Sequence, residues 1–152
     1  MPKSKIFLPD VNVWLAAAAE RHAHHRIARR WFESEEAAGG DLAFCRTTQS
    51  GLLRLVTHPR VMGDEVLTQV AAWDLYRELE SGARTHFLDE PPGLEPKWES
   101  FCRLPLPAHA LWTDGYLEAL ATLWGATMVT LDRGFVTRGR VAAVLLGGAR
   151  TD

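Results

Sequence analysis

Residues 5–15 read KIFLPDVNVWL: a short apolar run, then Asp10, then the start of an apolar-rich helical pattern. Residues 126–132, ATMVTLD, have a similar arrangement, because a mostly apolar run again ends at an aspartate, Asp132. Short runs that are apolar on both sides are typical of strands in a parallel sheet covered on both faces. The two stretches therefore predict buried parallel strands, each with a carboxylate at its carboxyl end.

The rest of the chain alternates between strand and helix patterns. Further strands are expected at residues 42–45 and 84–88, and also at 141–146, where a short helix is the alternative. Asp64 is expected to open a long helix that ends at about residue 81, and Thr113 to cap the helix over 114–124. Strands separated by helical crossovers indicate parallel pairing. The predicted fold class is therefore α/β, with a short, mainly parallel sheet of four to five strands flanked by helices on both faces.

Length and composition narrow the class of protein. The chain has 152 residues, of which 47% are hydrophobic and 24% charged, as expected for one globular domain over residues 1–152. No uncharged apolar run reaches the roughly 18 residues that a membrane span needs, and the N-terminus is a poor signal peptide. Two cysteines cannot build a disulfide scaffold or a four-thiolate metal site, so reduced thiols and a cytoplasmic location are expected.

The net charge of −2 is unevenly distributed along the chain. Residues 64–99 hold nine acidic and three basic residues, whereas both ends of the chain have an excess of basic side chains. This pattern excludes a basic field over the whole surface but is compatible with local basic patches that contact nucleic acid. Any nucleic acid is expected to approach away from the acidic segment.

Three aspartates fall where an open parallel sheet places its ligands. Asp10 and Asp132 directly follow strands, and Asp114 opens the helix that leads into the fourth strand. Such sheets bind ligands beyond the carboxyl ends of the strands, near the point where the strand order reverses. Carboxylates that converge repel one another, and a hard cation such as Mg²⁺ or Mn²⁺ relieves that repulsion. The residues therefore point to metal-dependent hydrolysis of a phosphodiester, the alternative being that each aspartate only caps a turn or helix.

Other polar residues accompany these aspartates. Asn12 and Thr130 are placed to support the metal ligands through hydrogen bonds, although both can equally be ordinary cap and strand residues. Arg54, Arg133 and Arg138 are candidate contacts to RNA phosphates. The alternatives are an ion pair for Arg54, a solvated turn for Arg133 and a solvated basic loop for Arg138. Phosphotransfer through Asp10 is disfavoured, because Asn12 stands where that chemistry needs a second acid.

Four strings of the sequence carry a family resemblance. They are LPDVNVWLAA, HAHHRIARRWF, TTQSGLLRLVTHPRVMG and TDGYLEALATLWGATMVTLDRGF, and they occur in this order up to about Phe135. Together they resemble PIN-domain proteins of the VapC toxin type. The resemblance implies a Mg²⁺- or Mn²⁺-dependent endoribonuclease that cuts loops of structured RNA, such as tRNA or rRNA. It also implies a homodimer and a VapB-like antitoxin partner.

The resemblance assigns the acidic positions of the family residue by residue. Three of them fall on Asp10, Asp114 and Asp132, while the fourth, usually a glutamate, falls on Gln49. Gln49 is then a candidate catalytic residue without a charge, which implies weaker metal binding. Glu118 lies one turn after Asp114 and could supply the missing charge, but a solvent-facing glutamate is the plainer interpretation. The alternative to an active nuclease is a catalytically weakened RNA- or antitoxin-binding module.

Overall fold

The computed structural model describes residues 4–147. Within this range the chain forms one parallel sheet with the strand order β3-β2-β1-β4-β5. The strands are β1 (Lys5–Pro9), β2 (Gly40–Phe44), β3 (Thr85–Phe87), β4 (Ala126–Thr130) and β5 (Ala143–Leu145). The sequence prediction of an α/β fold with a short parallel sheet is confirmed.

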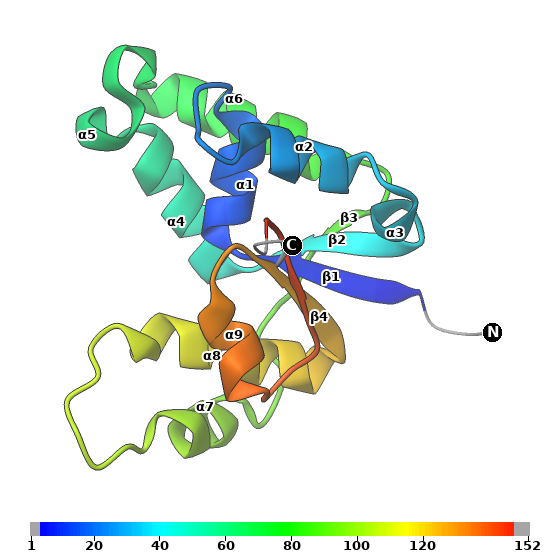
Figure 1. Ribbon diagram of the computed structural model, residues 1–152, viewed down its shortest axis with the longest axis vertical. Coiled ribbons are helices and arrows are strands. Elements are labelled where there is room, and N and C mark those ends of the chain that lie inside the picture. Colours follow the sequence, from blue (N-terminus) through cyan, green and yellow to red (C-terminus); the bar gives the residue numbers. More distant parts are fainter. Residues whose placement is uncertain (1–3, 148–152) are drawn as a thin grey trace, which may run out of the picture.

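Helices cover both faces of this sheet. They are α1 (Val11–Ala18), α2 (His25–Phe32), α3 (Glu35–Ala38), α4 (Arg46–Val56), α5 (Pro59–Met62), the 3-10 turn η1 (Gly63–Glu65), α6 (Gln69–Glu80), α7 (Leu94–Cys102), α8 (Leu111–Trp124) and α9 (Arg133–Arg138). Figure 1 shows α1, α2, α4, α5 and α6 on one face and α7, α8 and α9 on the other. No described helix is both long and apolar enough to cross a membrane.

The order of the strands reverses between β1 and β4. From β1 the chain builds β2 and β3 on one side and then returns to place β4 and β5 on the other. Pro9 at the end of β1 pairs with Val129 near the end of β4, so the two strands end side by side. Their carboxyl ends therefore flank the crevice in which open parallel sheets bind ligands.

Alternating side chains of the central strands fill both sides of the sheet. Leu8 and Met128 pack with α8 residues in one buried cluster, whereas Phe7 and Val129 pack with Trp31 in another. A slip of one residue in the pairing would exchange the two sets, so this double-sided core fixes the register. The strand ends, and the residues that follow them, are fixed with it.

Several helix boundaries differ from the sequence prediction. Helix α6 begins after Thr68, whose hydroxyl accepts a hydrogen bond from a backbone amide at 3.1 Å, whereas Asp64 lies in the preceding 3-10 turn. Helix α8 begins at Leu111, so Thr113 does not cap it and Asp114 lies inside its first turn. The segment before Gly39 forms two separate helices, α2 and α3.

Candidate active site

Asp10 lies at the junction of β1, β4 and α1. Its backbone amide donates to the carbonyl of Val129 at 2.8 Å, and its Oδ1 accepts from the amide of Val11 at 2.7 Å. The residue is only 8% exposed. Burial raises the pKa of Asp10 to about 6, and the charges of Asp114 and Asp132 act in the same direction. The three aspartates singled out in the sequence are therefore close enough to influence one another electrostatically.

Asp132 and Thr130 are joined at the end of β4. Asp132 caps α9, since its Oδ1 accepts from the amide of Gly134 at 2.8 Å, and its own amide donates to the Thr130 Oγ1 at 2.9 Å. Thr130 is fully buried, and a hydrogen bond from its side chain also favours the charged form of Asp10. Thr130 thus contacts two of the three aspartates.

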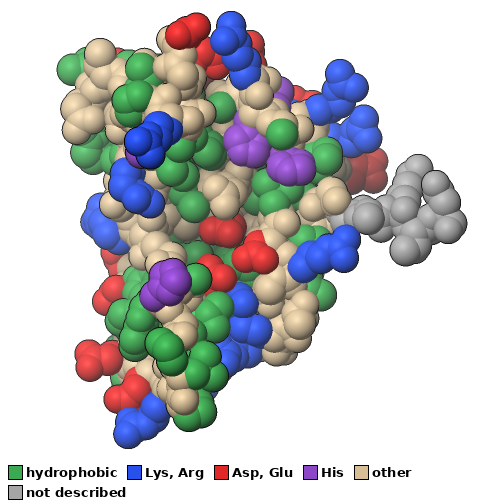
Figure 2. Space-filling model, turned by 60° about the vertical axis from the view of Figure 1, so that its left-hand side comes forward, with side chains coloured by type: hydrophobic (Ala, Val, Ile, Leu, Met, Phe, Trp, Pro, Cys, Tyr) green, Lys and Arg blue, Asp and Glu red, His purple; other side chains and the backbone are tan. Residues whose placement is uncertain are grey.

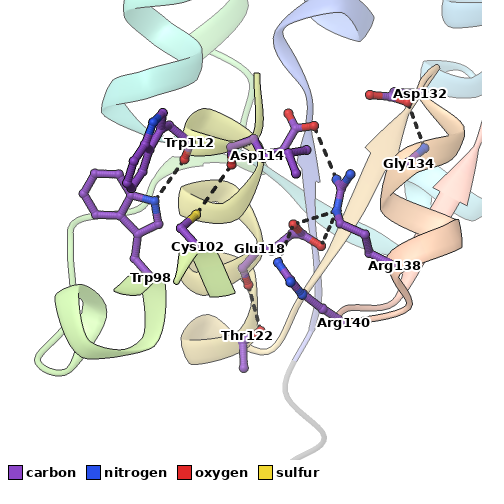
Figure 3. Close-up of polar contacts among 11 residues, drawn as sticks. Trp98, Cys102, Trp112, Asp114, Glu118, Thr122, Asp132, Gly134, Arg138 and Arg140 are labelled. Carbon is purple, nitrogen blue, oxygen red and sulfur yellow. Dashed lines mark hydrogen bonds and ion pairs between the residues drawn. The ribbon is translucent and has the colours of Figure 1, made fainter. Parts of the chain in front are cut away.

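Asp114 is bound to a basic side chain. Arg138 places its Nη2 at 3.3 Å from the Asp114 Oδ2, while its Nε donates to both carboxylate oxygens of Glu118 at 3.0 and 3.2 Å (Figure 3). Arg140 approaches the same carboxylate, with Nη1 at 3.6 Å from Oε1. Burial raises the pKa of Asp114, and the nearby Arg138 opposes that shift. Arg138 therefore neutralises part of the negative charge of the site.

This network corrects two expectations from the sequence. Glu118 does not face solvent: it has no exposed surface, because α9 and the following residues cover the side of α8 on which it lies. Residues 133–140 are not a flexible basic loop, because most of them form α9, and Arg138 and Arg140 turn inward to Glu118. Arg138 is consequently engaged in ion pairs and does not extend toward solvent as a basic tract would.

A cleft of about 400 Å³ opens beside Asp10. It is lined by Asp10, Val11, Arg46, Thr47, Thr48, Ser50, Gly51, Arg54, Thr113 and Leu117. Figure 2 shows acidic side chains grouped near the middle of this face, with basic side chains on either side. Arg54 is exposed on the wall of the cleft, and Arg133 is exposed next to Asp132. Sequence reasoning missed Thr47 and Arg46, although the spacing of Thr47 and Arg54 places them on one helix face.

Two predicted site residues do not join the carboxylates. Gln49 is buried, and its Oε1 accepts a hydrogen bond from the Nη1 of Arg46, whereas Thr48 and Ser50 on either side of it line the cleft. Asn12 is exposed, and the hydrogen bonds within residues 4–147 do not include one between Asn12 and Asp10. No hydrogen bond within the described residues therefore supports the role predicted for Asn12.

The carboxylates of the site are suitable ligands for a hard cation, although they are not gathered around a single position. Carboxylate oxygens are the ligands that Mg²⁺ and Mn²⁺ prefer, and a cation would relieve the repulsion from Asp114 and Asp132 that adds to burial in raising the pKa of Asp10. Within residues 4–147, however, no three Asp, Glu, His or Cys side chains are gathered closely enough to hold one ion. Sharing an ion would require the aspartates to move together and Asp114 to loosen its contact with Arg138.

Comparison with known proteins identifies the family. A family model of the PIN domain matches residues 7–140. This chain belongs to the PIN-domain family. Among PIN-domain relatives, Ribonuclease VapC41 of Mycobacterium tuberculosis is 39% identical over 145 residues, which cover 93% of this chain and 99% of the relative. Ribonuclease VapC25 of the same organism is 32% identical over 135 residues, covering 86% and 91% of the two chains. The resemblance to VapC-type proteins is thereby confirmed.

Solved PIN-type structures share the fold. VapBC2 from Rickettsia felis, bound to a DNA fragment from its promoter, matches with a TM-score of 0.68 and 14% identity over 93% of this chain and 98% of the other. Mycobacterium tuberculosis VapC20, described as a sarcin-ricin loop cleaving toxin, matches with a TM-score of 0.61 and 20% identity over 89% and 95%. These likenesses confirm the predicted PIN-like sheet flanked by helices.

Proposed function

We propose that this protein is an endoribonuclease toxin of a toxin–antitoxin pair and that it depends on Mg²⁺ or Mn²⁺. The observation that carries the proposal is that Asp10 lies where the strand order reverses, near enough to Asp114 and Asp132 for their charges to act on it. Relatives that match nearly the whole chain are named ribonucleases, which supports RNA as the substrate. The reaction class is hydrolysis of a phosphodiester bond.

The proposed roles follow from where each side chain lies. The metal ligands are Asp10, Asp114 and Asp132, each through carboxylate oxygens. When bound, the ion supplies activation of the attacking water and neutralises charge on the phosphate. Thr130 orients two of these aspartates through its hydrogen bonds, and the exposed Arg54 and Arg133 bind phosphates next to the one that is cleaved.

The proposed substrate is an unpaired loop of a structured RNA such as tRNA or rRNA. Proteins that read RNA sequence contact unstacked bases, which loops provide and A-form helices do not. VapC20, a structural relative, is described as cleaving the sarcin-ricin loop, which supports this class of target. The cleft beside Asp10 is bordered by Arg46 and Arg54, so a phosphate backbone finds favourable charge along it.

The proposed partners are a VapB-like antitoxin and a second copy of the chain. The likeness to the VapBC2 structure supports an antitoxin. Exposed apolar side chains of α5 and of α6, among them Val61 and Val70, offer an uncovered surface for one of these contacts. Both cysteines are free, consistent with a protein of the cytoplasm.

The experiment is to incubate the purified, partner-free protein with total cellular RNA and to map new RNA ends. It is run with Mg²⁺, with Mn²⁺ and with a chelator, alongside Asp10→Asn and the control Asp74→Asn, which changes an exposed aspartate of α6. We expect discrete ends that require the metal, persist in the control and vanish in Asp10→Asn. Folded protein that makes no ends with either metal would contradict the nuclease and favour the binding module.

A further inference from the structure

A second hollow adjoins the cleft beside Asp10. This hollow, the aromatic pocket, is lined by Arg46, Thr47, Glu90, Trp98, Trp112, Thr113 and Tyr116 and has a volume of about 360 Å³. Arg46, Thr47 and Thr113 line both the aromatic pocket and the cleft. The two hollows are therefore parts of one groove that leads from Asp10 to three aromatic rings.

The three rings meet edge to face and do not stack on one another. Trp98 meets Trp112 and Tyr116 edge-on, with centroids 6.2 and 5.6 Å apart and ring planes at 81° and 87°. The Trp98 indole N–H donates to the Trp112 carbonyl at 2.9 Å, as Figure 3 shows. Trp112 remains 57% exposed, which is costly for so large an apolar ring. The aromatic pocket thus presents a preformed stacking surface to solvent.

Polar groups complete the aromatic pocket. The Tyr116 hydroxyl donates to the Glu90 Oε1 at 2.7 Å, and within residues 4–147 the other oxygen of Glu90 accepts no hydrogen bond. Arg46 lies over the ring of Phe87, 4.7 Å from its centroid, and extends along the wall that the pocket shares with the cleft. The hollow therefore combines ring faces, a carboxylate acceptor and a cation.

We propose that the aromatic pocket binds one unpaired nucleobase of the RNA, on a nucleotide that flanks the phosphate cleaved beside Asp10. Trp112 supplies the stacking face, Glu90 accepts hydrogen bonds from N–H groups of the base, and Arg46 contacts the phosphate between pocket and cleft. Stacking on aromatic side chains, joined to hydrogen bonds on the base edge, is how proteins read single-stranded RNA. The proposal rests on the nuclease function and adds where its sequence preference arises.

The charged groups of the groove favour RNA over an apolar protein segment. Arg46 borders both hollows and Arg54 borders the cleft, and these two cations offset the charges of Glu90 and Asp10 for a bound polyanion. Because Glu90 belongs to the acidic segment 64–99, the proposed path departs from the sequence expectation that RNA approaches away from this segment. An apolar peptide would fill the space beside Trp112 but would offer no partner to the second oxygen of Glu90 or to the N–H groups of Arg46 that do not bond Gln49, and burying unpaired polar groups is unfavourable. The antitoxin is therefore the competing occupant that the experiment must separate.

The test uses a short RNA that contains the mapped cleavage site, together with versions in which each flanking nucleotide in turn lacks its base. Cleavage kinetics are measured for the parent, Trp112→Ala and Trp112→Phe. The control is Trp124→Ala, which removes a 39% exposed ring at the end of α8 that lines neither the cleft nor the aromatic pocket. We expect Trp112→Ala to raise KM by about tenfold, Trp112→Phe to retain most of the affinity and the control to match the parent. Circular dichroism checks that each variant is folded.

The abasic substrates identify the contact. At one flanking position, loss of the base should raise the KM of the parent by the same factor as Trp112→Ala does. The same loss should not raise the KM of Trp112→Ala any further. Independent, additive losses at every position would overturn the proposal. Unchanged RNA cleavage by Trp112→Ala would also overturn the proposal. This includes the result in which Trp112→Ala cleaves RNA like the parent but is no longer inhibited by the antitoxin.

A separate measurement keeps the two proposals distinguishable. If the parent cleaves no RNA, the nuclease function fails, and binding of fluorescently labelled single-stranded RNA oligonucleotides of mixed sequence to Asp10→Asn is measured by fluorescence anisotropy. Weaker binding after adding Trp112→Ala to this protein would still support the aromatic pocket as a base site. Equal binding with and without Trp112 would overturn it.

Discussion

The guanidinium of Arg138 lies against Glu118, a carboxylate with no exposed surface, and its Nε donates to both oxygens at 3.0 and 3.2 Å. The same guanidinium reaches Asp114, with 3.3 Å between Nη2 and Oδ2. A buried carboxylate is unfavourable unless it is paired, so this contact ties α9 to α8. Arg138 therefore links the packing of α9 against α8 to Asp114, a proposed metal ligand.

Replacing Arg138 should destabilise the fold. In Arg138→Gln, Glu118 keeps only the longer contact with Arg140, so we expect the free energy of unfolding to fall by about 3 kcal/mol. Urea denaturation measures the change. The control is Arg103→Gln, which breaks a pair with Glu99 whose side chains are 79% and 62% exposed and should cost less than about 1 kcal/mol. Similar losses in the two variants would show that the Glu118 pair is not structural.

The same substitution should change the response to divalent cations. Arg138 places a positive charge beside Asp114, where we propose that a metal ion binds, so the two cations compete for one carboxylate. We therefore expect Mn²⁺ to raise the melting temperature of Arg138→Gln more than that of the parent. Thermal unfolding across a Mn²⁺ titration measures this, and equal shifts would argue against a shared site.

Stability of the metal-free protein should depend on the ionisation of Asp10. Burial raises the pKa of Asp10 from 3.8 to about 6, so the folded state holds this proton more tightly than the unfolded chain. Asp10 favours folding most at pH values below 3.8, the pKa of this carboxyl in the unfolded chain. That contribution is lost as the pH rises through about 6. Asp10→Asn should therefore stabilise the chelated protein by about 2 to 3 kcal/mol at about pH 7 and by little near about pH 4.

Unfolding curves at the two pH values check this expectation. Asp74→Asn, at an exposed position of α6, should follow the parent at both. A gain for Asp10→Asn that is the same at both pH values would instead indicate a packing effect.

Gln49→Glu distinguishes a missing catalytic acid from a structural residue. The structure directs Gln49 to Arg46, so a glutamate there should form a charge-assisted hydrogen bond with Arg46 and add little to the cleft. We expect the cleavage rate to change by less than about tenfold, which corresponds to about 1.4 kcal/mol in the barrier. A much larger gain over a nearly inactive parent would instead identify a weakened family member that lacks its acid.

The strands and two of the aspartates were predictable because their signals are local. Asp10 and Asp132 directly follow apolar runs. That β1 and β4 are neighbours, which brings the two strand ends together, is known only from the structure. Glu118 was not predictable in this way. Helical spacing puts it on the face of Asp114, but its burial depends on Arg138, which lies twenty residues further along the chain.

The aromatic pocket is a second case in which local pattern was insufficient. Trp98 and Trp112 are fourteen residues apart, and Glu90 reaches Tyr116 across twenty-six. Trp112 lies just before the helix that the sequence predicts over 114–124, so no local pattern indicates which way its ring faces. Only the packing of α7 against α8 shows that the ring of Trp112 remains open to solvent beside the cleft.

The most direct measurement of the central claim is a Mg²⁺ titration of cleavage of one mapped RNA under single-turnover conditions. Parent, Asp10→Asn, Asp132→Asn and the control Asp74→Asn are compared. We expect no cleavage in chelator, saturation with Mg²⁺, an unchanged control and a loss of roughly 100-fold or more in both site variants. Cleavage by the parent that persists in chelator, or that survives in Asp10→Asn, would contradict a metal-dependent nuclease at this cleft.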